Sequence, residues 1–594
     1  RDRFILSAGH GSMLLYAINH LSGYRISMDD LKKFRQIGNT PGHPEYGHTD
    51  GVETTSGPLG QGISNAVGMA LAEAHLAARF NKNLYQIMNH HTYVLCGDGD
   101  LQEGISQEAM SLAGHLGLGK LVVLFDSNKI QLDGKVSLAY SENHKKRFES
   151  MGWQYLCVED GNDLIAINRA INRAKKELAK PSLIEIKTII GYGTSLEGTS
   201  KVHGSPIGEE EADVLRKKLK WAYEPFEIPE EVYNHFRKKV TLRGQRVHRR
   251  WKKMFSQYKE IYPNEAELFL QFIEGKTEIN LDELMSFTEV EKDATRNISG
   301  KVIDALSKKH LNLIGGSADL TASTKAKGSD GHLDKTNYLA RNINFGVREH
   351  AMGAIVNGMT LHGGLKVFGG AFFVFSDYMK PAIRLAAIME IPSIFVFSHD
   401  TIAVGEDGPT HQPIEQLTGL RAIPNLNVIR AADATETIAA WKIAMESTHT
   451  PTAIILTRQN VKNNKTTSFE GTKMGAYIVS PEQNALEGIL LAAGSEVELA
   501  IEAQIKLRKI GRDVRVVSMP SHYLFELQKG VYKNLVLPKK TKTLAIEMGS
   551  SLSWYKYTSH VYGIDTFGVS APLNDALEKF GFTSDHVVER FLKI

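Results

Sequence analysis

Acidic and amide side chains follow two strand-like apolar runs in the first third of the chain. Asp98 comes directly after "TYVLCG", and Asp126 and Asn128 come directly after "LVVLF". In open parallel sheets, ligands bind beyond the carboxyl ends of the strands, so we expect these side chains to share one site. A carboxylate and an amide oxygen suit Mg²⁺ or Ca²⁺, which would take further ligands from a phosphate. By itself, "GDG" is typical of a tight turn. Asn128 at the end of the next strand favours a metal site instead, because it gives Asp98 a partner for a shared ion.

A glycine-rich segment upstream has the composition of an anion-binding loop. Residues 57–71, "GPLGQGISNAVGMAL", predict a loop that leads into an amphipathic helix, whose N–H groups and dipole can hold an anion. The segment has neither the Gly-Lys-Ser/Thr of a P-loop nor the spaced glycines of a dinucleotide-binding fold. Together with the predicted metal site, it indicates a ligand that carries a diphosphate.

A second group of reactive side chains lies in the middle of the chain. Glu349 stands at the start of an apolar helical pattern, and Phe372, Phe375 and Tyr378 recur at three-residue intervals. Taken singly, the acid is typical of a helix start and the aromatic residues of a core. The loop "FSHDTIAVGEDGPTHQP" then places five ionisable residues between His399 and His411. Such a density in a Gly/Pro loop favours an active site over core packing.

The elements that must position these residues alternate between strand-like and helical patterns. This alternation predicts α/β domains with parallel sheets. From about Ser205 to Lys292 it gives way to charged helices and loops, which we interpret as a connector. It then resumes twice, before and after the polar stretch "VKNNKTTSFEGTK".

Composition excludes several classes of protein. The 70 Lys and Arg residues nearly balance the 67 Asp and Glu residues, and two cysteines are present. The charge balance and the lack of a long apolar run predict no nucleic-acid or membrane partner, and the few cysteines favour a reducing compartment. The basic run from Arg237 to Lys253 has acidic neighbours and no interleaved stacking aromatics, so we interpret it as a solvated helical face rather than a nucleic-acid site.

Eight motifs, in order along nearly the whole chain, resemble those of the transketolase family of thiamine diphosphate enzymes. They are "TPGHPEYG", "GPLGQGI", "KVHGSPIG", "GGSADLT", "FGVREH", "GEDGPTHQP", "TRQN" and "VVSMPS". In addition, "GDGDLQEGIS" through "FDSNKI" resembles the diphosphate and metal motif of thiamine diphosphate enzymes. The family's further N-terminal stretch with an "SGHPG" motif is not found here, and we expect that an upstream segment is missing. The resemblance implies two thiamine diphosphate-binding-type parallel-sheet domains and a smaller C-terminal α/β domain. We set their boundaries at residues 1–265 for the diphosphate-binding domain with its connector, 266–465 for the pyrimidine-binding domain and 466–594 for the C-terminal domain.

The resemblance also implies a role for each matching residue. The expected metal ligands are Asp98, Asn128 and the Ile130 carbonyl. The expected cofactor contacts are Gly57, Leu59, Gly99, Glu103, Glu108, Asp319, Glu349, Phe372, Phe375 and Tyr378, with Glu103 and Glu108 linking cofactor sites across a subunit interface. The expected catalytic residues are Glu349, His10, His43, His203 and His411. The expected substrate contacts are His10, His203, Arg296, Ser323, His399, Asp407, His411 and Arg458.

The activity that the resemblance implies is a reversible two-carbon transfer. A ketol (glycolaldehyde) unit would pass from a ketose phosphate such as xylulose 5-phosphate to an aldose phosphate such as ribose 5-phosphate, in the non-oxidative pentose phosphate pathway. The implied cofactors are thiamine diphosphate and Mg²⁺, with Ca²⁺ or another divalent ion as alternatives, in a cytoplasmic homodimer with active sites at the subunit interface. Two alternatives stay open, a relative similar to dihydroxyacetone synthase and, if the N-terminal segment is truly absent, an inactive scaffold.

Overall fold

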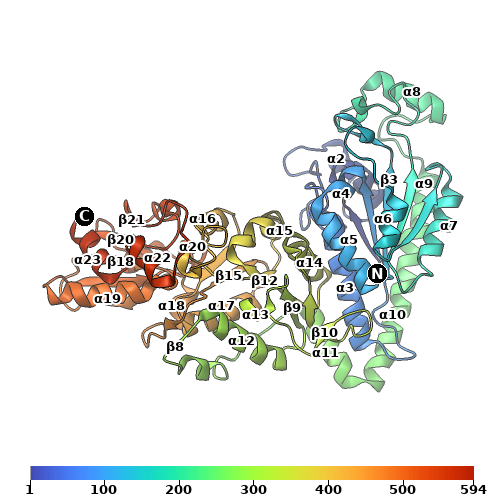
Figure 1. Ribbon diagram of the computed structural model, residues 1–594. Helices are drawn as coiled ribbons and strands as arrows, with labels where there is room; N and C mark the ends of the chain where they lie inside the picture. Colours follow the sequence, from blue (N-terminus) through green and yellow to red (C-terminus); the bar gives the residue numbers. More distant parts are fainter. Residues whose placement is uncertain (1) are drawn as a thin grey trace. The chain divides into compact units, whose positions relative to one another are not determined.

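The computed structural model describes residues 2–594, which divide into two compact units (Figure 1). The first unit runs to Ile273 and also includes Asp334–Leu339 and Asn357–Gly363. The second unit comprises Glu274–Leu333, Ala340–Val356 and Gly364–Ile594. Both units are built from largely parallel sheets with helices packed on them, so the predicted α/β class is confirmed.

The first unit contains a five-stranded parallel sheet in the order β1-β2-β3-β7-β6. Its strands are β1 (Arg3–Leu6), β2 (Thr92–Gly97), β3 (Leu121–Ser127), β6 (Gln154–Val158) and β7 (Ser182–Lys187). In β3 and β7 nearly every side chain is buried, as expected for parallel strands covered on both faces.

Helices cover this sheet according to the distribution of their apolar side chains. Helix α7 (Leu164–Ala174) places apolar side chains on β6 and β7. Helix α3 (Gln61–Phe80) packs on α5 (Gly104–Leu116) and on β1 and β2. The prediction of an amphipathic α3 was wrong, because nearly all of its side chains are buried, including polar ones such as Asn65. Its many small residues allow close packing on all sides.

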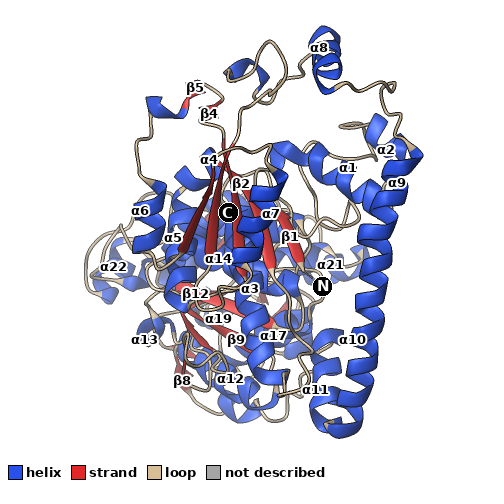
Figure 2. Cartoon of the chain, turned by 90° about the vertical axis from the view of Figure 1, so that its right-hand side faces the viewer, coloured by secondary structure: helices blue, strands red, loops and turns tan. Residues whose placement is uncertain are grey.

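Charged helices follow the first sheet, as the sequence predicts for the connector. They are α8 (Glu209–Leu219), α9 (Glu230–Phe236), α10 (Leu242–Ile261) and α11 (Pro263–Glu274). Figure 2 shows α10 as one continuous helix, and nearly all of its basic side chains are exposed. Two side chains attach α10 to the rest of the first unit: Trp251 donates to the Ile87 carbonyl (2.9 Å) and Tyr258 donates to the Phe80 carbonyl (2.8 Å).

The second unit begins with a seven-stranded parallel sheet in the order β10-β11-β9-β12-β13-β15-β14. Its strands are β9 (Leu313–Ser317), β10 (His332–Leu333), β11 (Asn342–Asn344), β12 (Lys366–Phe372), β13 (Ile394–Ser398), β14 (Asn427–Arg430) and β15 (Thr452–Leu456). Helices α12 (Thr295–Lys309) and α17 (Ala434–Glu446) pack together over a fully buried core around Trp441. Trp441 donates to the Ser299 hydroxyl on α12 (2.8 Å), which fixes the two helices together.

A five-stranded sheet near the C-terminus completes the second unit, with the order β17-β19-β18-β20-β21. Its strands are β17 (Tyr477–Ser480), β18 (Gly488–Ala492), β19 (Val514–Ser518), β20 (Thr543–Ile546) and β21 (His560–Tyr562), of which β17 is antiparallel. Helices α19 (Glu496–Lys509) and α23 (Ser584–Leu592) cover one face with an apolar core. No helix in residues 2–594 combines the length and apolar character needed to span a membrane.

Candidate active site

The two polar strand ends in the first unit lie side by side. Asp98 is the first residue of helix α4 (Asp98–Gln102), directly after β2, and Asn128 follows β3. The pairing of Gly97 with Asp126 makes these strand ends adjacent. The Asp98 carboxylate accepts from the Lys129 N–H (3.3 Å), and the Asn128 side-chain oxygen accepts from the Ile130 N–H (2.9 Å). Asp98 therefore faces the segment that carries the other two expected metal ligands.

The electrostatics of Asp98 fit a cation site. Its side chain is buried, and burial raises its pKa to about 6, with further contributions from the Asp126 and Glu185 carboxylates. A bound divalent cation would offset both effects. Residues 2–594 hold no cluster of three His, Cys, Asp or Glu side chains suited to a metal. A metal here would therefore combine Asp98 with neutral oxygens and the oxygens of a ligand, a donor set that suits Mg²⁺.

A cavity of about 880 Å³ extends from these strand ends within the first unit. Its volume lies within the usual range for small-molecule sites. The cavity brings together nine of the predicted site residues: His10, His43, Gly57, Leu59, Asp98, Gly99, Asn128, Ile130 and His203. These residues come from segments nearly two hundred positions apart, so the fold assembles the site from distant motifs.

Two glycines shape the wall of this cavity. A Cβ atom at Gly99 would lie 2.8 Å from the Leu59 side chain, and a Cβ atom at Gly57 would lie 3.4 Å from the His43 ring. Gly57 also has φ +148°, a conformation that other residues rarely adopt. A side chain at Gly99 would displace Leu59, and the backbone of Gly57 favours glycine, so both glycines keep this wall of the cavity in shape.

Three imidazoles face the cavity. The rings of His10 and His203 lie 5.3 Å apart, centroid to centroid. Burial lowers the pKa of His203, and His10 lowers it further. The pKa of His43 is also lowered by burial and by the nearby charges of Arg35 and His10. His43 and His203 are therefore neutral near pH 7 and able to accept a proton.

Asp100, which sequence reasoning did not select, positions the loops around the cavity. Its side chain is 0% exposed. One carboxylate oxygen accepts from the Ser7 hydroxyl (2.7 Å) and the Gly60 N–H (2.9 Å), and the other accepts from the Gly97 N–H (3.0 Å). Burial is the main cause that raises the pKa of Asp100. The only signal in the sequence is that "GDGD" contains a second acid.

The predicted aromatic residues of the second unit gather around two histidines. Phe372 ends β12, Phe375 ends a short 3-10 helix, and Tyr378 lies on α15 (Ser376–Ile388). The Phe372 ring lies 3.9 Å from His399, and the Phe375 ring lies 5.5 Å from His411 and 6.0 Å from Tyr378. Phe372 and Phe375 are half-buried and Tyr378 is exposed, so these rings are not part of a closed core.

Two arginines lie close enough to His399 to lower its pKa. Burial lowers the pKa of His399 to about 3, and Arg296, Arg458 and His411 lower it further. The pKa of Arg296 is lowered by burial and by Arg458. Arg296 donates to the Ser323 backbone carbonyl (2.8 Å), while its Nε has no hydrogen-bond partner among the described residues. Arg296 is half-buried and Arg458 is exposed. Two neighbouring guanidiniums are suited to a phosphate dianion.

The remaining predicted residues occupy more varied positions. Glu349 is the half-buried first residue of α14 (Glu349–His362), and burial raises its pKa. Asp319, which follows β9, and Asp407, in the loop before His411, are exposed. Glu103, directly before α5, is exposed, and Glu108, on α5, is half-buried. Neither of them lines the cavity of the first unit. The structure thus groups most, but not all, of the predicted residues.

Comparison with known proteins identifies the family. The chain matches a thiamine diphosphate binding domain of transketolase over residues 1–278, a transketolase pyrimidine binding domain over residues 291–464 and a transketolase-like C-terminal domain over residues 475–583. It is 55% identical to a transketolase of Geobacillus stearothermophilus, over 99% of this chain and 90% of the relative. It is 53% identical to a transketolase of Bacillus subtilis, with the same coverage.

Solved structures support the same family. A transketolase from Leishmania mexicana superimposes with a TM-score of 0.96 at 43% identity, covering 100% of this chain and 89% of that chain. A transketolase from Pichia stipitis, solved with sedoheptulose 7-phosphate, gives 0.97 at 42% identity with the same coverage. The fold and its thiamine diphosphate-binding domains define an enzyme that transfers aldehyde or ketone groups. The chain belongs to the transketolase family.

Proposed function

We propose that the protein transfers a two-carbon ketol unit reversibly between sugar phosphates, with xylulose 5-phosphate as a donor and ribose 5-phosphate as an acceptor. The observation that carries this proposal is the group of Arg296, Arg458 and His399, in which both guanidiniums lower the pKa of His399 and which lies beside the ring of Phe372. A phosphate on the sugar would supply negative charge for these two guanidiniums. The Pichia stipitis relative, whose structure contains sedoheptulose 7-phosphate, supports a substrate of this class.

The residues that would hold thiamine diphosphate fall into two groups. Asp98, Asn128 and the Ile130 carbonyl would bind a divalent ion on the diphosphate, with Gly57, Leu59 and Gly99 lining it. Glu349, Asp319, Phe372, Phe375 and Tyr378 would bind the pyrimidine. When bound, the cofactor supplies an electron sink for the two-carbon unit.

Glu349 holds the proton that the pyrimidine end requires. Because burial raises its pKa, its carboxyl retains a proton more readily than an exposed glutamate does. A protonated carboxyl can donate to a ring nitrogen, and in a site removed from water this bond is strong. Glu349 therefore both orients the ring and fixes its protonation.

Histidines move the protons of the substrate. His203 is neutral near pH 7, so one of its ring nitrogens can accept a proton from a sugar hydroxyl as a carbon–carbon bond breaks. His411 is the second candidate for this role, and Asp407 would accept from another sugar hydroxyl. His10 and His43 complete the wall near the reacting carbons.

Other features of the assembly belong to the same proposal. We propose a homodimer with active sites at the subunit interface, in which Glu103 and Glu108 link the two cofactor sites. We also propose domain boundaries after residues 265 and 465. Both cysteines are free thiols, which suits a role in the cytoplasmic non-oxidative pentose phosphate pathway.

Turnover of xylulose 5-phosphate with ribose 5-phosphate tests the function. The protein is stripped of metal with EDTA and assayed with thiamine diphosphate and Mg²⁺ singly and together. Formation of sedoheptulose 7-phosphate only when both are present supports the proposal. Absence of product under all conditions contradicts it, and product with formaldehyde as the preferred acceptor indicates a dihydroxyacetone synthase instead. The oligomeric state of the active enzyme, measured by analytical ultracentrifugation, tests the proposed dimer. An active monomer would rule the dimer out.

A further inference from the structure

One loop of the second unit carries three of the predicted substrate residues. It runs from His399, directly after β13, to Gln412, and also contains Asp407 and His411. His399 has φ +66°, a left-handed conformation that is uncommon for a residue other than glycine. Such a conformation persists only where the surrounding structure enforces it. The contacts of this loop therefore show what holds the predicted phosphate site in shape.

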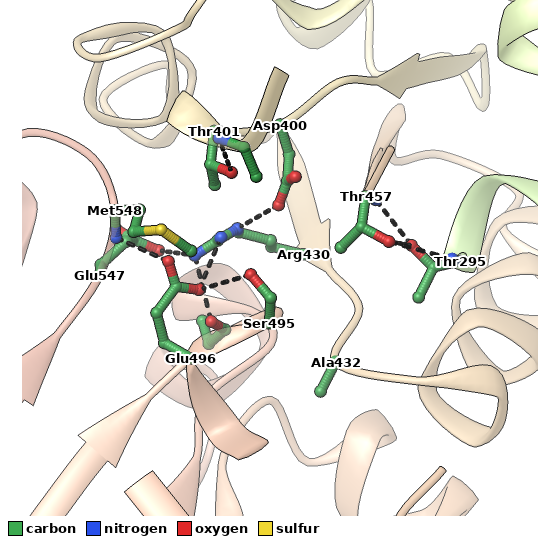
Figure 3. Close-up of polar contacts among 12 residues, drawn as sticks. Thr295, Asp400, Thr401, Arg430, Ala432, Thr457, Ser495, Glu496, Glu547 and Met548 are labelled. Carbon is green, nitrogen blue, oxygen red and sulfur yellow. Dashed lines mark hydrogen bonds and ion pairs between the residues drawn. The ribbon is translucent and has the colours of Figure 1, made fainter. Parts of the chain in front are cut away.

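The first end of the loop is held by a buried ionic cluster. Arg430, at the end of β14, donates from Nε to the Asp400 carboxylate (2.9 Å). Its other nitrogens contact Glu496 (2.7 Å), Glu547 (3.1 Å) and the Ala493 carbonyl (3.1 Å). Figure 3 shows the guanidinium between Asp400 and the pair Glu496 and Glu547. Glu496 begins α19 and Glu547 follows β20, so both acids belong to the C-terminal sheet domain.

This cluster is a poor device for stability alone. All four charged side chains are at most 1% exposed. The desolvation of buried ion pairs often cancels their attraction, and apolar replacements are frequently as stable. Arg430 does, however, fix Asp400, the residue next to His399. A role in geometry therefore explains the cluster better than a role in stability.

The other end of the loop is attached to the C-terminal domain by neutral hydrogen bonds. The Gln412 amide donates to the Ile402 carbonyl (3.2 Å) and the Gly405 carbonyl (2.9 Å) within the loop, and to the Val569 carbonyl (2.9 Å) in the C-terminal domain. The Ser570 hydroxyl donates to the Glu406 carbonyl (2.6 Å), next to Asp407. The buried Gln412 side chain therefore closes the loop on itself and ties it to Val569.

We infer that the C-terminal sheet domain positions the sugar-phosphate loop 399–412, with Arg430 and Asp400 anchoring its start and Gln412 and Ser570 anchoring its end. These are positioning residues, because they act through His399, Asp407 and His411. The inference rests on the proposed function, which makes those three residues substrate contacts. It assigns the C-terminal domain a task in substrate binding that is separate from holding the cofactor.

Two variants test the inference with a matched control. Gln412→Met keeps the volume of the side chain and removes all three hydrogen bonds, and Ser570→Ala removes one bond at an exposed position. Ser553→Ala is the control: its hydroxyl accepts a bond from Arg421 and so links the same two parts of the second unit, away from the loop. The Gln412 amide has two N–H groups for its three carbonyl partners. At about fivefold for each lost N–H bond, we expect the KM for xylulose 5-phosphate to rise about 25-fold in Gln412→Met. The corresponding expectation for Ser570→Ala is a rise of about threefold to fivefold.

Further readouts separate positioning from loss of structure. Positioning predicts a raised KM for the phosphorylated ketose, unchanged affinity for thiamine diphosphate and faster hydrogen exchange in residues 402–412 of Gln412→Met. Loss of structure would instead lower the active fraction and the cofactor affinity together. A KM and an exchange rate that match those of Ser553→Ala in both variants would overturn the inference. If the unmodified protein turned over no sugar phosphate, the proposed function would fail, whereas the exchange result would still report on the loop anchors.

Discussion

Replacement of Asp100 tests whether one buried acid organises the cavity at the end of β2. Asp100→Ala removes the acceptor of three hydrogen bonds, from the Ser7 hydroxyl and the Gly60 and Gly97 N–H groups. Each buried polar group left without a partner lowers the free energy of unfolding by about 1–3 kcal/mol. Three such groups amount to roughly 3–9 kcal/mol, and we expect the lower half of this range because water can enter and satisfy part of them.

Asp100→Asn gives a graded comparison. Its side-chain oxygen can still accept from Ser7 and Gly60, while its NH₂ group faces the Gly97 N–H and loses that one bond. We therefore expect Asp100→Asn to lower the free energy of unfolding by about 1–3 kcal/mol, roughly a third of the loss expected for Asp100→Ala. The ratio between the two variants depends on the hydrogen-bond count and not on the absolute cost of any one bond.

Native-state hydrogen exchange measures these losses at the affected groups themselves. The peptide that contains the Gly97 amide should exchange faster in both variants, whereas the peptide that contains the Gly60 amide should exchange faster only in Asp100→Ala. Asp133→Asn serves as a control, because Asp133 lines the same cavity but is exposed. If Asp100→Ala exchanged no faster than the control, or Asn and Ala had equal effects, the assignment of Asp100 as a three-way anchor would be wrong.

Three further predictions concern catalysis, substrate binding and pH. Glu349→Gln should lower kcat by about 10²–10⁴-fold while circular dichroism is unchanged; near-normal turnover would remove its assigned role. Arg458→Ala should raise the KM for phosphorylated sugars about tenfold or more, and an equal loss with unphosphorylated xylulose would argue against phosphate contact. Burial lowers the pKa of His90 to about 2 and of His362 to about 4, so the unfolded chain takes up protons first and stability should fall as pH drops below about 6.5. His90→Phe should make the fall in Tm between pH 6.5 and 4 less steep. An unchanged slope would contradict the prediction that protonation of His90 in the unfolded chain lowers stability.

Local patterns were enough to predict the α/β elements and the closeness of the two polar strand ends. The apolar runs that end at Asp98 and Asp126 do form neighbouring parallel strands, because sequential βα units tend to place their strands together. The amphipathic prediction for α3 failed, since small residues such as Gly62 and Gly68 let it pack on all sides. Strand order was not predictable either, because β1 pairs with β2 across more than eighty intervening residues.

Partners of buried charges could not be predicted from local patterns. Asp100 receives bonds from Ser7 and Gly60, 93 and 40 residues away, and Arg430 contacts Glu547, 117 residues away. No periodicity or spacing rule links such positions, because each contact depends on how whole domains pack. The sequence therefore predicts which residues share a cavity more readily than which buried residues hold them in place.

The same arrangement occurs at both predicted ligand sites. At the end of β2, Asp98 faces the cavity while Asp100 points into the protein and ties three loops together. After β13, His399 faces the cationic site while Asp400 points inward to Arg430. In each pair, one residue lines a predicted ligand site and a close neighbour in sequence fixes the backbone that presents it. Because backbone position at a strand end controls where the exposed side chain lies, substitutions at Asp100 and Asp400 should change ligand affinity without removing any ligand contact.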